Sequence, residues 1–158
     1  MTAELEQYLI KKYPNLYTGI GEQEPFTLFG FECSDGWFRI ILWLSESIQN
    51  HIDSHNNWAA KSPATKPIEQ VKVVQVKEKF AGLRFYYGGG DDVIRGMVAL
   101  AETIAYNTCE ATGVTDGVGR NVKGWITTHH KSRAKNPKDW HPVDDEELIE
   151  ILAKIKGA

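Results

Sequence analysis

The sequence predicts an α+β fold, in which helices pack on a small antiparallel β-sheet formed by a hairpin at about residues 70–88. Two observations predict this fold. A central stretch alternates at the period of a strand, and the segments on both sides of it repeat apolar residues at the period of a helix. The chain has 158 residues, of which 42% are hydrophobic and 25% are charged, so we expect one domain over residues 1–158.

The first helix is expected in the segment AELEQYLIKKY. Leu5, Leu9 and Tyr13 recur there at every fourth position. Pro14 follows and ends the pattern, because proline cannot continue a helix. Residues 14–30 contain several glycines and a proline, so we expect them to be irregular.

A second helix is expected in the segment SDGWFRIILWLSESIQNHID, where Ser34 or Asp35 can cap the first turn. Its apolar face is formed by Phe38, Ile41, Leu42 and Ile48. Residues 53–69 are polar and include two prolines, which is typical of a surface loop.

The hairpin is expected in VKVVQVKEKFAGLRFYY, with its turn near Ala81 and Gly82. β-Branched valines fill the first strand, and apolar and polar residues alternate in the second. Since successive side chains of a strand point to opposite sides, Arg84 and Tyr86 are predicted to face solvent. The residues predicted to face the core are Leu83, Phe85 and Tyr87.

A third helix is expected in DDVIRGMVALAETIAYNTC, capped by Asp91 or Asp92. The glycines before it could cradle a phosphate, but the two aspartates place negative charge there and no P-loop motif is present. A last short helix is predicted in DDEELIEILAKIK, whose acidic first turn and basic last turn match the helix dipole. The apolar face of the third helix is formed by Val93, Ile94, Met97, Val98, Ala101, Ile104 and Ala105.

The overall charge and the cysteines limit the classes of function. A formal net charge of −3 argues against general electrostatic binding of nucleic acid, although it leaves a local basic patch open. Cys33 and Cys109 lie far apart, as expected for free thiols in a reducing compartment. The chain starts without a secretory-signal pattern, and its apolar runs are too short to span a bilayer. We therefore expect a soluble intracellular protein.

No complete catalytic or metal-binding constellation is present in the sequence. His51 and His55 have the spacing of two ligands on one helical face, but no accompanying glutamate, so we expect solvated histidines. The carboxylates at 91–92 and 144–147 open predicted helices, where capping and the dipole explain them. No nucleophile signature surrounds any serine or cysteine.

Basic and aromatic residues gather on the outward side of the predicted hairpin. Tyrosine and arginine are enriched at binding surfaces, and a cationic cluster favours an acidic protein face or a phosphate-bearing ligand. The alternative is an ordinary amphipathic sheet with a charged outer face. The candidate binding residues are Lys77, Lys79, Arg84 and Tyr86.

The segments ECSDGWFRII, VVQVKEKFAGLRFYYGGGDD, TCE and GWITTHH follow one another within residues 28–130. In this order they resemble a family of short, functionally uncharacterised proteins carried by tailed bacteriophages and prophages. The segment KEKFAGLRFY is the most specific part of the resemblance. The resemblance implies a phage context and the host-cell cytoplasm, but no known reaction.

Members of that family typically read C-E-x-C-G after the long helix and then G-W followed by a cysteine and a histidine, which resembles a four-ligand zinc knuckle. Cys109 and His130 stand at the first and third of these positions. Thr112 and Arg133 stand at the second and fourth, and neither side chain is an effective zinc ligand. We therefore expect a remnant of the knuckle without metal, kept as a loop by its glycines and by packing of Trp125. The histidines that could substitute are His129 and His141.

Three functions are compatible with these sequence features. The first is a non-enzymatic phage accessory protein that binds a host or phage macromolecule, for example a component of host defence. The second is a small-ligand or nucleotide-binding protein that uses the hairpin surface. The third, least favoured, is a metal-assisted hydrolase or nuclease. We expect a protein partner, no cofactor, no general nucleic-acid binding and no membrane association; the sequence does not indicate the oligomeric state.

Overall fold

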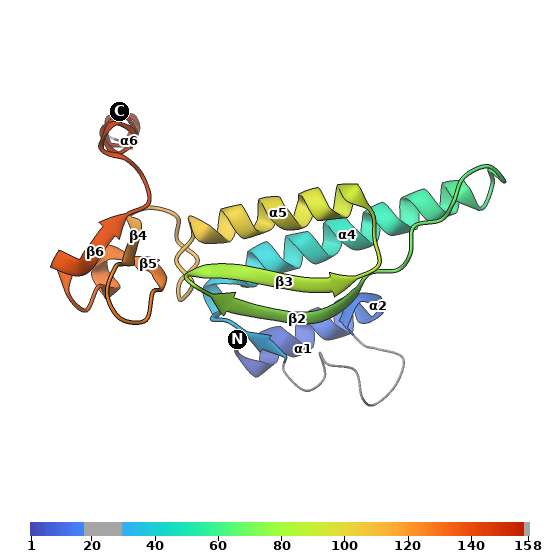
Figure 1. Ribbon diagram of the computed structural model, residues 1–158, viewed down its shortest axis with the longest axis horizontal. Coiled ribbons are helices and arrows are strands. Elements are labelled where there is room, and N and C mark those ends of the chain that lie inside the picture. Colours follow the sequence, from blue (N-terminus) through green and yellow to red (C-terminus); the bar gives the residue numbers. More distant parts are fainter. Residues whose placement is uncertain (18–29, 157–158) are drawn as a thin grey trace.

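The computed structural model describes residues 1–17 and 30–156 and has the predicted α+β fold (Figure 1). Residues 18–29, most of the segment predicted to be irregular, lie outside the described residues. The elements are α1 (Ala3–Lys12), α2 (Pro14–Tyr17), β1 (Phe31–Glu32), η1 (Asp35–Trp37), α4 (Phe38–Ala59), β2 (Lys72–Lys79), β3 (Gly82–Gly88), α5 (Asp92–Tyr106), β4 (Val118–Asn121), β5 (Thr128–His130), η2 (Lys131–Arg133), η3 (Pro137–Asp139), β6 (Trp140–Pro142) and α6 (Glu146–Lys156).

The first sheet has the order β1-β2-β3. β2 and β3 form the predicted antiparallel hairpin, but its two-residue turn is Phe80–Ala81 instead of Ala81–Gly82, because Lys79 pairs with Gly82. β1 was not predicted, and it pairs with β2 in the parallel direction. The sheet is therefore mixed, with one antiparallel and one parallel pairing.

Helices α1, α2, α4 and α5 and the first sheet share one apolar core. Leu83 and Phe85 are buried as predicted, and Tyr87 is partly buried against the same core. Tyr86 is 40% exposed, since no helix of residues 1–17 and 30–156 covers the outer face of the hairpin. The remaining large, fully buried side chains are Leu9, Leu16, Tyr17, Trp37, Ile41, Ile48, Ile52, Val71, Val76, Ile94 and Val118.

Helices α4 and α5 depart from the predictions in detail. α4 continues to Ala59, so the surface loop begins about seven residues later than predicted, where the helix has left the sheet (Figure 1). Asp91 caps α5 as expected, and its side chain accepts a hydrogen bond from the amide of Ile94. Val93 and Ile104 were predicted to be buried but are 51% and 45% exposed, because both lie at the same edge of the buried face of α5.

A second sheet of order β5-β4-β6 replaces the loop that was expected after α5. The prediction that Trp125 packs inside this region is wrong, since its side chain is 79% exposed. The predicted last helix is present as α6, with acidic residues in its first turn and basic residues in its last. However, no residue of α6 is buried, and Figure 1 shows the helix beyond the second sheet, away from α4 and α5.

The segment around η1 joins the core to the turn that follows α5. The amide of Gly36 donates to the carbonyl oxygen of Glu110 at 2.7 Å. A Cβ atom on Gly36 would lie 2.4 Å from the carbonyl oxygens of Cys109 and Glu110, so this close approach requires glycine. The indole nitrogen of Trp37 donates to the carbonyl oxygen of Thr108 at 3.0 Å, and the Trp37 side chain is fully buried.

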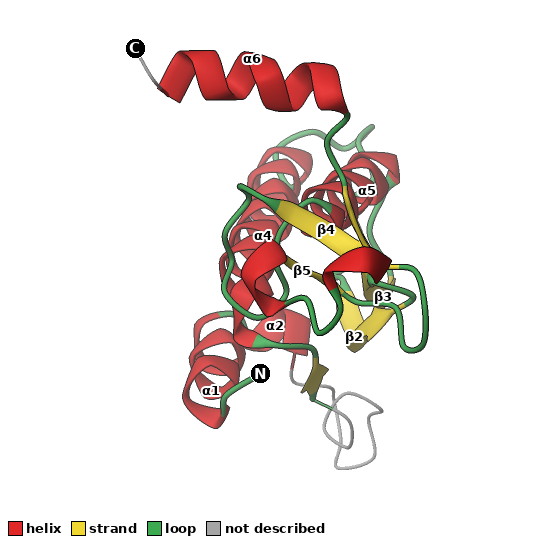
Figure 2. Cartoon of the chain, turned by 90° about the vertical axis from the view of Figure 1, so that its left-hand side faces the viewer, coloured by secondary structure: helices red, strands yellow, loops and turns green. Residues whose placement is uncertain are grey.

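A second junction joins the hairpin to the second sheet. The buried hydroxyl of Thr128 donates to the carbonyl oxygen of Ala81 at 2.7 Å. The guanidinium of Arg120 lies 3.1 Å from the centroid of the Tyr106 ring and also donates to Thr128. Figure 1 shows the second sheet at one end of the first sheet and of α5, and in Figure 2 it lies in front of them with α6 above. Among the described residues, no helix is long and apolar enough to cross a membrane.

Candidate binding surfaces

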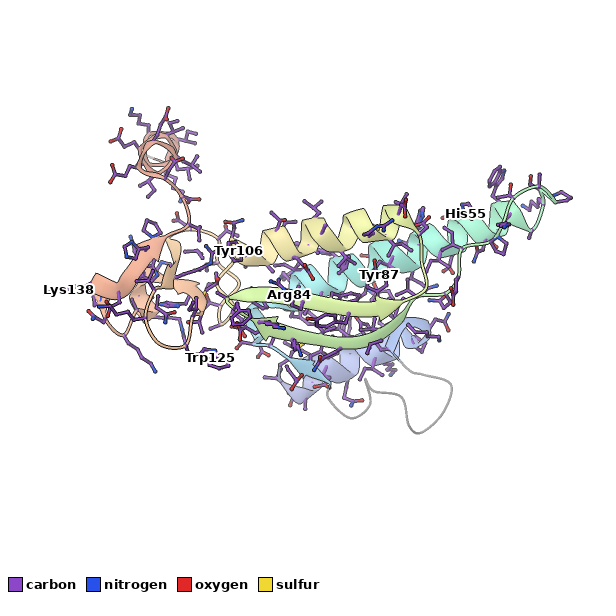
Figure 3. All side chains as sticks on the ribbon, viewed as in Figure 1. His55, Arg84, Tyr87, Tyr106, Trp125 and Lys138 are labelled. Atoms are coloured by element: carbon purple, nitrogen blue, oxygen red, sulfur yellow. The ribbon has the colours of Figure 1, made fainter. Side chains whose placement is uncertain are left out.

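The four candidate residues of the hairpin lie together on its outer face. Lys77 is the cross-strand neighbour of Arg84. The ammonium group of Lys77 lies 5.5 Å from the centroid of the Tyr86 ring, which fits a cation–π contact. Arg84 approaches the carboxylate of Glu102 at 3.9 Å and donates to the carbonyl oxygen of Leu83, so its guanidinium is partly engaged within the protein. Figure 3 shows Arg84 near the end of β3 that meets the second sheet.

The turn of this hairpin is unusual in conformation and in exposure. Phe80 and Ala81 both have positive φ angles, 51° and 64°, and they are the non-glycine residues with this conformation in the described part of the chain. Ala81 is fully buried, whereas Phe80 is 74% exposed. The ammonium group of Lys79 lies 5.7 Å from the centroid of the Phe80 ring. A left-handed backbone conformation costs an L-residue roughly 1–2 kcal/mol. The fold therefore holds Phe80 in an unfavourable backbone conformation while its apolar side chain is exposed to solvent.

The structure brings together the positions that the resemblance assigns to a zinc knuckle. Thr112, His130 and Arg133 line one hollow of about 340 Å³, and the buried Cys109 lies next to Thr112. The chain forms a tight turn here, in which the amide of Gly113, at a φ of 75°, donates to the carbonyl oxygen of Cys109 at 2.8 Å. The ligand types do not fit zinc, however, because a guanidinium cannot coordinate it and a threonine hydroxyl does so poorly.

The environment of Cys109 differs from that of Cys33. Burial acts to raise the pKa of the Cys109 thiol, but hydrogen bonds from the Thr112 side chain and nearby backbone amides outweigh it, so the pKa lies below its ordinary value. Burial raises the pKa of Cys33 to about 12, so this thiol stays protonated at neutral pH. The hydrogen bonds at Cys109 are of the kind that stabilise a thiolate.

We predict that the purified protein contains no stoichiometric zinc and that EDTA leaves its melting temperature unchanged. The reason is that Thr112 and Arg133 replace two of the four ligands of the knuckle. Elemental analysis and a thermal melt with and without EDTA measure this. The double variant Thr112→Cys, Arg133→His supplies the missing ligand types and is expected to bind zinc. About one zinc ion per wild-type chain would contradict the prediction.

The histidines and carboxylates considered in the sequence do not form a metal site within residues 1–17 and 30–156. His51 is half-buried and not simply solvated, since its Nε2 lies 2.9 Å from the carboxylate of Asp91. Burial acts to raise the pKa of Asp91, but the hydrogen bonds from His51 and the Ile94 amide outweigh it and lower the pKa. His55 is half-buried, with its Nε2 3.0 Å from the carbonyl oxygen of Lys66. These contacts join α4 to the start of α5 and to the following loop.

A larger hollow, of about 620 Å³, lies in the second sheet and was missed in the sequence. Positive charge is concentrated in this part of the chain, because residues 117–142 contain six lysines and arginines and one acidic residue, Asp139. The whole-chain charge of −3 hides this local excess. A count of charge by segment would have found it. The cationic and aromatic side chains that line the hollow are Lys123, Trp125, His129, Arg133, Lys135 and Trp140.

His129 lies at the wall of this larger hollow. Its Nδ1 is 3.2 Å from the carbonyl oxygen of Thr127, an arrangement in which Nδ1 donates the hydrogen bond. Its Nε2 is buried and has no hydrogen-bond partner among the described residues. Because that nitrogen is covered by protein atoms, a ligand would reach it only after a local movement of the wall.

No family model matches this chain, and no curated protein or solved structure is significantly similar to it. The function must therefore be inferred from the geometry of the surfaces described above.

Proposed function

We propose that this chain is a non-enzymatic binding protein that engages a protein partner through the tip and outer face of the hairpin. The observation that carries the proposal is the ring of Phe80, which is 74% exposed at a turn of positive φ. An exposed aromatic residue held by strained backbone contributes little to the fold, and strain of this kind concentrates at functional positions.

The residues around Phe80 indicate the chemistry of the partner. Lys77 and Lys79 take part in none of the ion pairs within the described residues, whereas Arg84 lies near Glu102. An aromatic anchor surrounded by cations and a tyrosine is the composition of a binding hot spot with a charged rim. We therefore propose that the partner presents an apolar pocket bordered by acidic side chains.

The biological setting of the proposal follows from the resemblance to proteins of tailed phages. In that setting the partner is a host or phage protein, for example a component of host defence, and the site of action is the host-cell cytoplasm. Catalysis is the less favoured alternative, because His51 and His55 are engaged in contacts within the fold, and Asp91 and Asp145 cap helices.

We predict that Phe80→Gly abolishes partner binding without loss of stability. Glycine tolerates positive φ, so the free energy of unfolding should stay equal or rise by up to about 1 kcal/mol. Removal of a hot-spot aromatic typically costs at least about 2 kcal/mol of binding, roughly a 30-fold loss of affinity. Affinity capture from phage-infected host lysate, quantified by mass spectrometry against the wild type, measures binding, and a thermal melt measures stability.

The charged rim is tested by Lys77→Glu with Lys79→Glu, which should also lose the captured partner. The matched control is Lys61→Glu with Lys66→Glu, which makes the same change of charge on two lysines at the far end of α4. A partner retained by all three variants would place the binding surface elsewhere. A large drop in the melting temperature of Phe80→Gly would show that the Phe80 ring is structural.

A further inference from the structure

The hollow of about 620 Å³ in the second sheet combines positive charge with an aromatic platform. Most of its lining comes from two loops, one between β4 and β5 and one between β5 and β6, and Ser34, Glu110 and Ala111 also contribute. Lys123 comes from the first loop, and Arg133 and Lys135 come from the second. Its volume of about 620 Å³ lies in the range of sites that hold small molecules or single nucleotides.

The two tryptophans of the hollow play different roles. Trp140 is half-buried, and its indole nitrogen donates to the carbonyl oxygen of His129 at 3.3 Å. Trp125 is 79% exposed, and Figure 3 shows its side chain projecting away from the ribbon. The backbone around Trp125 is nevertheless held, because the Asn121 side-chain amide donates to the carbonyl oxygens of Lys123 and Trp125 at 2.8 and 2.6 Å. The loop thus presents a flat aromatic ring that the core does not use.

The charges at the hollow are available to an anion. Lys123 is paired with Asp139 at 3.1 Å, but none of the ion pairs within the described residues involves Arg133 or Lys135. The carboxylate of Glu110, also in the lining, already accepts a hydrogen bond from the amide of Ser34 at 2.9 Å. With three cations and two carboxylates, Glu110 and Asp139, the lining carries a net positive charge next to the exposed ring of Trp125.

We infer that this hollow binds a nucleotide unit of a single-stranded nucleic acid, with a base stacked on Trp125 and a phosphate held by Arg133 and Lys135. Stacking platforms beside a cationic groove are how proteins hold single strands without reading their sequence. Lys123, Arg133 and Lys135 line the hollow, while Lys131 and Lys138 lie outside its lining, and this spread of cations favours a strand that extends past one phosphate over a free nucleotide. A duplex fits less well, because its bases are not free to stack on a side chain.

An acidic peptide is the competing ligand for a cationic surface. It would use the guanidinium and ammonium groups but would not need a solvent-exposed indole held on an ordered loop. The inference concerns a different surface from that of the proposed function, so failure of either one leaves the other standing.

Fluorescence anisotropy with a labelled single-stranded oligothymidylate of about 16 nucleotides tests the inference. At low salt the wild type is expected to bind, with an affinity that falls as salt is added, since counterions are released. Trp125→Ala should weaken binding about 5- to 100-fold, in keeping with the loss of one stacked base. Arg133→Glu with Lys135→Glu should weaken it at least as strongly and should flatten the salt dependence, by a slope of roughly 0.7 for each phosphate that the variant no longer neutralises.

The control is again Lys61→Glu with Lys66→Glu, which should bind like the wild type. If thymidine monophosphate competed as well as an unlabelled oligonucleotide, stacking on Trp125 and phosphate binding would be supported, but the ligand would be a free nucleotide. Equal binding of a duplex, equal competition by polyglutamate, or no effect of Trp125→Ala would each overturn the inference. So would the absence of binding by the wild type at low salt.

Discussion

Replacing Phe85 by alanine is expected to lower the free energy of unfolding by about 3–5 kcal/mol. The ring is only 3% exposed and belongs to the core shared by the first sheet and the helices. The centroid of the Phe85 ring lies 6.1 Å from that of the Tyr87 ring, and Phe85 pairs with Val76 across the hairpin. Truncation would leave a cavity that a close-packed core cannot fill. Urea unfolding followed by circular dichroism measures the loss.

The adjacent residue provides the control for this prediction. Tyr86 lies on the outer face and is 40% exposed, so Tyr86→Ala should cost less than about 1 kcal/mol. A cost below about 1 kcal/mol for Phe85→Ala would place its ring at the surface and contradict the orientation of β3. If both variants lost a similar free energy of unfolding, the alternation of side chains along β3 would not determine which of them are buried.

The burial of Phe85 could be predicted because the period of a strand fixes which side chains share a face. The same reasoning works for the capping of α5 by Asp91 and for the charged ends of α6, where the signal lies within one or two turns of the chain. Local patterns of this kind require no knowledge of the rest of the molecule.

The missed elements depend on contacts between distant parts of the chain. β1 has two residues and is defined only by its pairing with β2, in which Phe31 lies beside Val76. The strands of the second sheet have three or four residues and include Gly119, so they show no clear alternation. A Cβ atom on Gly119 would lie 2.4 Å from the ring of Trp140, so this glycine is explained only by the folded structure.

The candidate surfaces were predicted to different extents. The grouping of Lys77, Arg84 and Tyr86 on one face followed from the period of the strand. Phe80 was missed because the turn was placed one residue too late, and neither Phe nor Ala is a usual residue at positive φ. The hollow of about 620 Å³ lined by Lys123, Arg133 and Lys135, here called the basic hollow, was missed because charge was summed over the whole chain. An error of one residue in the position of the turn was therefore enough to hide Phe80 as an exposed aromatic residue.

The two proposed surfaces lie close to each other in the fold. Ala81, the second residue of the hairpin turn, accepts a hydrogen bond from Thr128, which also lines the basic hollow. Phe80 precedes Ala81, so its backbone is one residue away from this contact. A ligand that moves the wall of the hollow would thus act on the turn that presents Phe80.

Replacing Trp37 by alanine is expected to lower the free energy of unfolding by about 3–5 kcal/mol and to weaken the attachment of the second sheet. Trp37 is fully buried, and its indole donates to the carbonyl oxygen of Thr108 at the end of α5. The neighbouring amide of Gly36 donates to Glu110, which lines the basic hollow. Loss of the indole should therefore speed hydrogen exchange at the Gly36 amide and weaken oligonucleotide binding as well as stability.

Trp37→Phe separates packing from hydrogen bonding at this junction. Phenylalanine keeps most of the apolar volume but cannot donate, so the buried carbonyl of Thr108 would lose its partner at a cost of about 1–3 kcal/mol. Faster exchange at the Gly36 amide in Trp37→Phe, with little loss of global stability, would show that the hydrogen bond mainly orders the junction. If hydrogen exchange at the Gly36 amide were unchanged in both variants, the Gly36–Glu110 contact would hold the second sheet without Trp37. The close approach of the two chain segments, which only glycine permits, would then be sufficient.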